Sequence, residues 1–65
     1  MTDAIDITPG QRIREQREAL SLSREGLAFK AGISFKTLER IETGKQEPRR
    51  ATLQVLEKAL AEESA

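Results

Sequence analysis

Residues 23–48 read SREGLAFKAGISFKTLERIETGKQEP and carry the signals for two short helices joined by a tight turn. Ser23 is a good N-cap residue, because its hydroxyl accepts a hydrogen bond from a backbone amide in the first helical turn. Gly32 stands where the end of a helix needs a positive φ angle, and Ser34 caps the helix that follows. The pattern therefore predicts a helix-turn-helix over residues 24–43.

Apolar residues on either side of this motif repeat at helical spacing and predict two further helices. Upstream, Pro9 suits a first helical turn, and Thr8 with Gln11 has the spacing of a capping box. Downstream, the basic loop 43–50 leads into a last amphipathic segment. The residues expected to face inward are Ile13, Leu20, Leu27, Ala28, Ala31, Ile33, Leu38, Ile41, Leu53, Leu56, Ala59 and Leu60. The prediction is an all-α fold of four helices.

Composition limits the chemistry of the chain. Its 65 residues, 37% hydrophobic and 34% charged, suit one small domain with a thin core. The absence of Cys and His excludes disulfides, thiolate nucleophiles, the common zinc sites and Ser-His-Asp triads. Carboxylates such as Glu39 and Glu42 on one short helix are weak support for catalysis. We therefore expect no enzyme activity, no metal and no cofactor.

The chain divides into three expected parts. Residues 1–8 form a short acidic N-terminal extension, residues 9–62 the helical domain, and residues 63–65 a C-terminal tail. The opening MTDAIDIT is acidic where a secretory signal is basic and then apolar, and no apolar run approaches the ~18 residues of a membrane span. The expectation is a cytoplasmic protein with no membrane contact.

A net charge of zero conceals an uneven distribution along the chain. Residues 10–50 contain 10 basic and 6 acidic side chains, whereas residues 1–9 and 51–65 each carry a net charge of −2. A positive middle suits an anionic partner such as nucleic acid. Ordinary solvated surface charge explains the same numbers, so charge alone does not assign a function.

The third predicted helix has one apolar and one polar face. Leu38 and Ile41 point one way, and the opposite stripe follows the i, i+3, i+4, i+7 pattern. This stripe consists of Lys36, Glu39, Arg40 and Thr43. It is either a binding face or a solvated surface.

With these caps, this turn glycine and this apolar spacing, the segment 23–48 resembles the XRE-type helix-turn-helix of the Cro and lambdoid phage repressor superfamily. The resemblance extends over about residues 11–60. It is carried by Arg17 in QREAL, Leu27-Ala28, Gly32, Ser34, Glu42 and Gly44 in IETGK, and Pro48. The resemblance implies a small four-helix, or truncated five-helix, lambda-repressor-like DNA-binding domain.

The resemblance also implies roles for individual residues, because the helix that begins at Ser34 would enter the major groove of double-stranded DNA while its predecessor crosses the backbone. The candidates for base-edge contact are Phe35, Lys36, Glu39 and Arg40. The candidates for phosphate contact are Arg24, Ser34, Thr37, Thr43 and Lys45. Lys36 and Arg40 suit guanine, Phe35 a thymine methyl, and Glu39 either accepts from cytosine or screens its neighbours. For Phe35, packing beneath the start of its own helix is an alternative of equal weight to the base contact.

Two further features follow from the family pattern. Arg17 and Glu42 occupy positions that pair as a structural salt bridge, tying the first helix to the end of the third. Family members commonly continue into a fifth helix that contributes to dimer contacts, and the present chain ends at LAEESA before it. Either a homodimer then uses another surface, or the protein binds DNA as a weak monomer.

Phe29 and Val55 are the candidates for contact with a partner. Phe29 falls at a position that is normally polar, and Val55 lies at the margin of the last apolar stripe. The rival interpretation is that a small core recruits both side chains.

The main functional hypothesis is a sequence-specific, double-stranded DNA-binding transcriptional regulator of the repressor type, cytoplasmic and nucleoid-associated. The alternative is an antitoxin-like or adaptor module that uses the same fold to bind a protein such as a toxin or a co-regulator. Its support is the zero net charge, Phe29 and the missing fifth helix.

Overall fold

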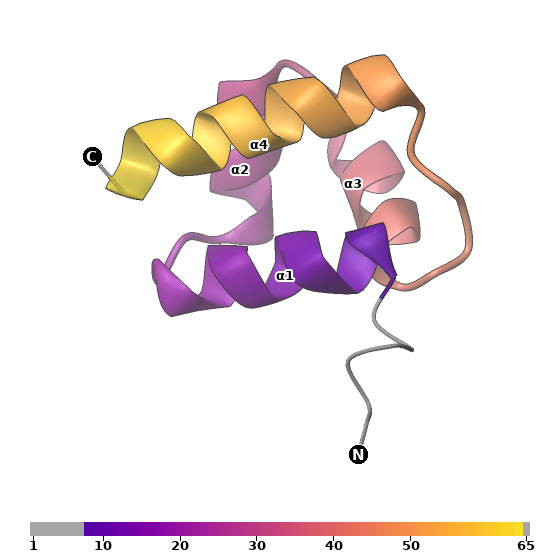
Figure 1. The fold of residues 1–65 in the computed structure, drawn as a ribbon, viewed down its shortest axis with the longest axis horizontal. Coiled ribbons are helices and arrows are strands. Elements are labelled where there is room, and N and C mark those ends of the chain that lie inside the picture. The colour runs from indigo at the N-terminus through magenta and orange to yellow at the C-terminus, as the bar shows by residue number, and fades with distance from the viewer. Residues whose placement is uncertain (1–7, 65) are drawn as a thin grey trace.

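Four helices account for most of residues 8–64, the part of the chain that the computed structural model describes. They are α1 (Pro9–Ala19), α2 (Arg24–Ala31), α3 (Phe35–Glu42) and α4 (Arg50–Ser64), in the order shown in Figure 1. No strand occurs among residues 8–64. The predicted all-α fold and its four helices are confirmed.

The starts of α1, α2 and α3 are capped as the sequence predicts. At α1, the Thr8 hydroxyl accepts from the backbone N–H of Gln11 at 3.1 Å, and the Gln11 side chain accepts from the N–H of Thr8 at 3.0 Å. Ser23 and Ser34 cap α2 and α3 by accepting from backbone amides at 2.9 and 3.0 Å. Each cap satisfies amides that the first helical turn leaves without partners.

The first three helices end in the same way, with a residue in the left-handed region. These residues are Ser21 (φ 55°), Gly32 (φ 76°) and Gly44 (φ 80°). After α1, for example, Leu22 N–H donates to the carbonyl of Arg17 at 3.0 Å, which is the long hydrogen bond of a Schellman motif. Gly32 confirms the predicted helix stop. Ser21 holds the same conformation with a Cβ atom, which costs more than it does for glycine.

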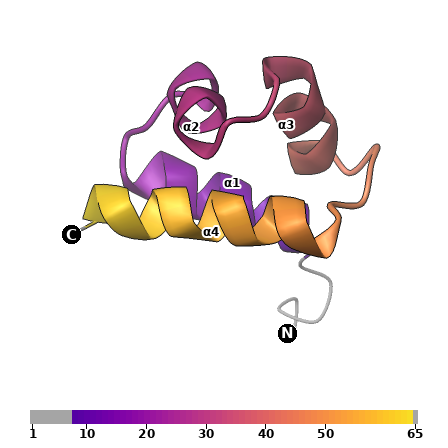
Figure 2. The same cartoon turned by 90° about the horizontal axis from the view of Figure 1, so that it is seen from above.

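The helices pack in two layers. Figure 2 shows α1 and α4 on one side and α2 and α3 on the other. Between the layers lies a core of eight buried side chains: Ile13, Leu27, Ala28, Leu38, Ile41, Leu56, Ala59 and Leu60. These are predicted inward-facing residues. The other four, Leu20, Ala31, Ile33 and Leu53, pack at the edge of the core and are only half-buried.

Gly10 sets the distance between α1 and α3. It is buried in the first turn of α1, and a Cβ atom at this position would collide with the carbonyl oxygen of Ile41 and press on its Cγ2 at 3.3 Å. Only glycine lets the start of α1 pass this close to the end of α3. No local sequence pattern indicates this role for Gly10.

The structure describes the expected N-terminal extension and C-terminal tail only in part. Of the acidic extension 1–8, residues 1–7 lie outside the described residues, and Thr8 caps α1. The expected tail 63–65 begins within α4, which continues through Ser64. Within the described part of the chain, none of the helices has the length and apolar character needed to cross a membrane.

We predict that Gly10→Ala destabilises the fold by about 1 to 3 kcal/mol, the usual cost of overpacking a tight site. Urea unfolding followed by circular dichroism measures the change. In a helix without this contact the same substitution would stabilise by up to about 1 kcal/mol, so the sign of the effect is decisive. Glu15→Ala, on the exposed surface of the same helix, serves as the control and should shift stability by less than about 0.5 kcal/mol.

Candidate nucleic-acid interface

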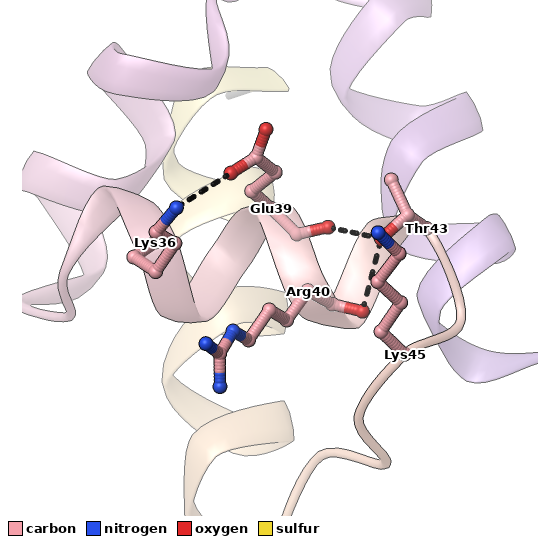
Figure 3. A pocket seen from close by; sticks show the side chains of 5 residues that line it. All are labelled: Lys36, Glu39, Arg40, Thr43 and Lys45. Carbon is pink, nitrogen blue, oxygen red and sulfur yellow. Dashed lines mark hydrogen bonds and ion pairs between the residues drawn. The ribbon is translucent and has the colours of Figure 1, made fainter.

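The polar stripe predicted for α3 lines a surface hollow in the structure. Lys36, Glu39, Arg40 and Thr43 surround it together with Lys45 from the following loop. Figure 3 shows Lys36 and Glu39 turned toward one another, while the Arg40 guanidinium extends in another direction. Because Leu38 and Ile41 on the opposite side of α3 are buried in the core, the helix has its polar stripe turned outward.

Arg17 of α1 and Glu42 of α3 form a buried ion pair. Arg17 Nε donates to Glu42 Oε2 at 2.8 Å and Arg17 Nη2 donates to Oε1 at 2.9 Å, so the contact is bidentate. The third guanidinium nitrogen, Nη1, donates to the carbonyl of Leu22 at 2.9 Å. Hydrogen bonding to Glu42 raises the pKa of Arg17 above its ordinary value, against the opposing effect of burial. The guanidinium therefore stays charged at every pH at which the protein is handled.

Arg24 extends this pair into a chain of alternating charges. Its Nε donates to Glu42 Oε1 at 3.0 Å, and its Nη1 lies 4.0 Å from Glu39 Oε2. Glu39 Oε1 in turn lies 3.9 Å from Lys36 Nζ. Side-chain exposure is 0% for Glu42, 10% for Arg17, 25% for Arg24, 39% for Glu39 and 72% for Lys36. We call these five residues the charge chain; it connects the core to the outer face of α3.

This arrangement gives Arg24 a role that the sequence analysis did not identify. Arg24 was expected to contact phosphate, yet two of its guanidinium nitrogens face the carboxylates of Glu42 and Glu39. Eighteen residues separate Arg24 from Glu42, so no local pattern indicates their contact.

The hydroxyl groups expected at phosphates make local hydrogen bonds. Ser34 Oγ accepts from the backbone N–H of Thr37 and donates to Thr37 Oγ1 at 2.8 Å. Thr43 Oγ1 donates to the carbonyl of Glu39 at 2.8 Å. The Thr37 hydroxyl thus accepts one hydrogen bond, and its own proton remains available for a further acceptor.

The apolar candidates lie at the surface on three different helices. Phe35, in the first turn of α3, and Val55, on α4, are both exposed. Phe29 on α2 is 88% exposed. The interpretation that a small core recruits Phe29 is therefore wrong. Val55 is 39% exposed and is not among the partly buried side chains packed against the core.

Comparison with known proteins agrees with this architecture. A family model described as helix-turn-helix matches residues 13–64, most of the chain. The chain belongs to the XRE-type helix-turn-helix family. Within this helix-turn-helix domain the motif comprises α2, the turn at Gly32 and α3.

One curated relative of this helix-turn-helix chain comes from Rhodospirillum rubrum and is named an uncharacterized transcriptional regulator in the ATPase CF(0) region. It is 39% identical over 57 residues, which cover 88% of the present chain and 53% of the relative. The chain therefore spans about half the length of that protein. No solved structure gives a significant match.

We predict that Glu42→Gln lowers the free energy of unfolding by about 3 to 5 kcal/mol, because it removes the bidentate carboxylate partner of the buried Arg17 guanidinium. The remaining opposing charge, Glu18, is half-exposed and 3.9 Å away. Denaturant unfolding measures this loss, and a largely unfolded variant at 25 °C would agree with it. Glu63→Gln removes a carboxylate from the exposed Lys30–Glu63 pair, whose N–O distance is 3.4 Å and which does not contact Arg17. That control should cost less than about 1 kcal/mol. Equal losses in the two variants would contradict the structural role of Glu42.

Proposed function

We propose that this domain is a sequence-specific, double-stranded DNA-binding transcriptional regulator of the repressor type, with α3 in the major groove. The observation that carries the proposal is the outer face of α3, where Lys36, Glu39, Arg40 and Thr43 surround one hollow. An α-helix fits the major groove, and base edges there are read by side chains of this kind. The proposal assigns the domain no catalysed reaction and no cofactor.

Four residues are proposed to contact base edges. Lys36 and Arg40 donate to guanine O6 and N7, the commonest specific contact of basic side chains. Exposed Phe35 at the start of α3 touches a thymine methyl group, and Glu39 accepts from a base amino group.

Phosphate contacts are proposed around the two ends of α3 and at the start of α2. The residues are Arg24, Ser34, Thr37, Thr43 and Lys45. Thr37 has a hydroxyl proton to donate, and Lys45 follows the positive-φ residue Gly44 in an exposed loop. Ser34 and Thr43 would contact phosphate through hydroxyls that also bind the backbone. Arg24 would reach phosphate with the part of its guanidinium that does not face Glu42 and Glu39.

The curated relative supports a regulatory role, since its name describes a transcriptional regulator and it shares 39% identity over 57 residues. A regulator of this type reads a palindromic site as a homodimer, and the half-sites then lie about 10 base pairs apart. We propose such a homodimer for this domain.

A second candidate function is supported by Phe29. Phe29 exposes 88% of its surface on α2, so a large aromatic side chain is accessible to a protein partner. The corresponding proposal is an antitoxin-like or adaptor module, in which Phe29 and Val55 bind a toxin or a co-regulator.

Selection of random duplex DNA by the purified protein at near-physiological salt separates the two functions. The DNA-binding proposal expects enrichment of an inverted repeat whose half-site spacing is one helical turn, and affinity that falls steeply with salt. Enrichment of a single half-site would keep DNA binding and reject the homodimer. If a folded protein enriches no sequence, the DNA-binding proposal fails and the interaction module becomes the better account.

We predict that Arg40→Ala relaxes base preference at one position of the selected site, with a loss of about 1 to 3 kcal/mol on the preferred duplex if the contact with guanine is bidentate. Binding titrations against single-base variants measure both quantities. Arg12→Ala removes the same charge from the hollow between α1 and α4 and should leave base preference intact. Unchanged preference in Arg40→Ala would refute the assignment of Arg40 to a base.

A further inference from the structure

Lys36 and Glu39 place a hydrogen-bond donor beside an acceptor on the outer face of α3. They are one turn apart, with Lys36 Nζ 3.9 Å from Glu39 Oε1. Both line the hollow that the proposed function assigns to base recognition. Figure 3 shows the two side chains directed toward one another across that turn of the helix.

Glu39 is more constrained than an ordinary surface carboxylate. One of its oxygens faces Lys36, and the other lies 4.0 Å from Arg24 Nη1. Arg24 is itself held by Glu42, whose side chain is fully buried. The Glu39 carboxylate therefore lies between two cations from α3 and α2, and the charge chain holds one of those cations against the core. Such support favours a defined orientation over the mobile one that is usual for exposed ion pairs.

The pair matches the hydrogen-bonding pattern of a single base pair. In the major groove guanine presents the acceptors N7 and O6, and the paired cytosine presents the N4 amino donor next to them. An ammonium group beside a carboxylate is complementary to this order of acceptors and donor. We infer that Lys36 and Glu39 together read one G·C base pair, with Lys36 donating to guanine and Glu39 accepting from cytosine N4. This inference rests on the proposed function.

Glu39 contributes mainly by rejecting thymine and guanine at the cytosine position, where the carboxylate would face the acceptors O4 and O6. Adenine at that position presents its N6 amino donor and is tolerated. A carboxylate repels a carbonyl oxygen. Glu39 therefore provides specificity by disfavouring the wrong base. Lys36 provides the attraction, since an ammonium binds any acceptor and by itself discriminates weakly. Loss of Glu39 should therefore strengthen binding to wrong sequences, whereas loss of Lys36 should weaken binding to the correct one.

The test uses the full chain and the duplex enriched by selection. Dissociation constants are measured for that duplex and for versions in which each base pair is replaced in turn. For the unmodified protein we expect one G·C pair whose replacement by A·T or C·G weakens binding about tenfold, the size of one good base contact. Replacement by T·A, which keeps an acceptor opposite Lys36 and a donor opposite Glu39, should cost less. Lys36→Ala and Glu39→Ala should each reduce this discrimination to about two- to threefold at the same base pair. Glu39→Ala should also bind the A·T and C·G duplexes more tightly than the unmodified protein does, because these place an acceptor opposite the carboxylate.

Charge-matched controls separate base reading from net charge. Lys58→Ala and Glu57→Ala make the same changes in charge on α4, where both residues are exposed and line other hollows. Both controls should keep the tenfold discrimination. The Lys36→Ala/Glu39→Ala double variant should lose no more discrimination than either single variant, because the two residues read one base pair.

Different failures have different meanings. If the folded protein enriches no sequence, the proposed function fails and this inference fails with it. If a sequence is enriched but the two single variants alter different base pairs, or alter none, the inference is overturned while the proposed function stands. Retention of tenfold discrimination by Glu39→Ala would likewise overturn it.

Discussion

The carboxylate of Glu42 is fully buried in a domain of this size, and that constraint organises the rest of the structure. A buried charge is tolerated only when opposite charges and hydrogen bonds surround it. Glu42 on α3 receives Arg17 from α1 and Arg24 from α2, so three helices must meet at one point. Arg17 also donates to the carbonyl of Leu22 between α1 and α2. One ionic cluster therefore fixes the position of α3 relative to two other helices.

The same cluster connects stability with the outer face of α3. From Glu42 the charge chain continues through Arg24 to Glu39 and Lys36, with exposure increasing toward the surface. A purely apolar contact at Glu42 would hold α3 in place equally well, since apolar replacements of buried ion pairs are often neutral or stabilising. It would not orient charged side chains on the outer face. The ion pairs of Glu42 therefore connect the core with the charged side chains on the outer face of α3.

Features that depend on nearby residues were predictable from the sequence. The caps at Thr8, Ser23 and Ser34 and the stop at Gly32 arise from hydrogen bonds and torsion angles within a few residues. The features that were missed depend on the tertiary structure. Gly10 lies thirty-one residues from Ile41, and its role appears only when α1 crosses the end of α3. Ser21 is an exception, because the Schellman motif after α1 is local; it was missed since its left-handed φ is carried by serine where glycine is the usual signal.

The candidate site likewise combines features that were predictable from the sequence with features that were not. The polar stripe of α3 follows from helical spacing, and the hollow brings the predicted residues together with Lys45. The engagement of Arg24 with two carboxylates is long-range and carries no sequence signal. Phe29 could be assigned to the core or to a partner from sequence, and its exposure excludes the core. Contacts to individual bases and phosphates depend on the DNA and stay predictions.

The most direct test of the account is methylation interference on the duplex that the protein selects. Methylation of guanine N7 modifies the major groove, whereas methylation of adenine N3 modifies the minor groove. If α3 reads base edges in the major groove, N7 methylation at guanines within each half-site should abolish binding, and N3 methylation there should have little effect. Interference confined to adenine N3, or binding that is indifferent to guanine methylation, would contradict the central claim.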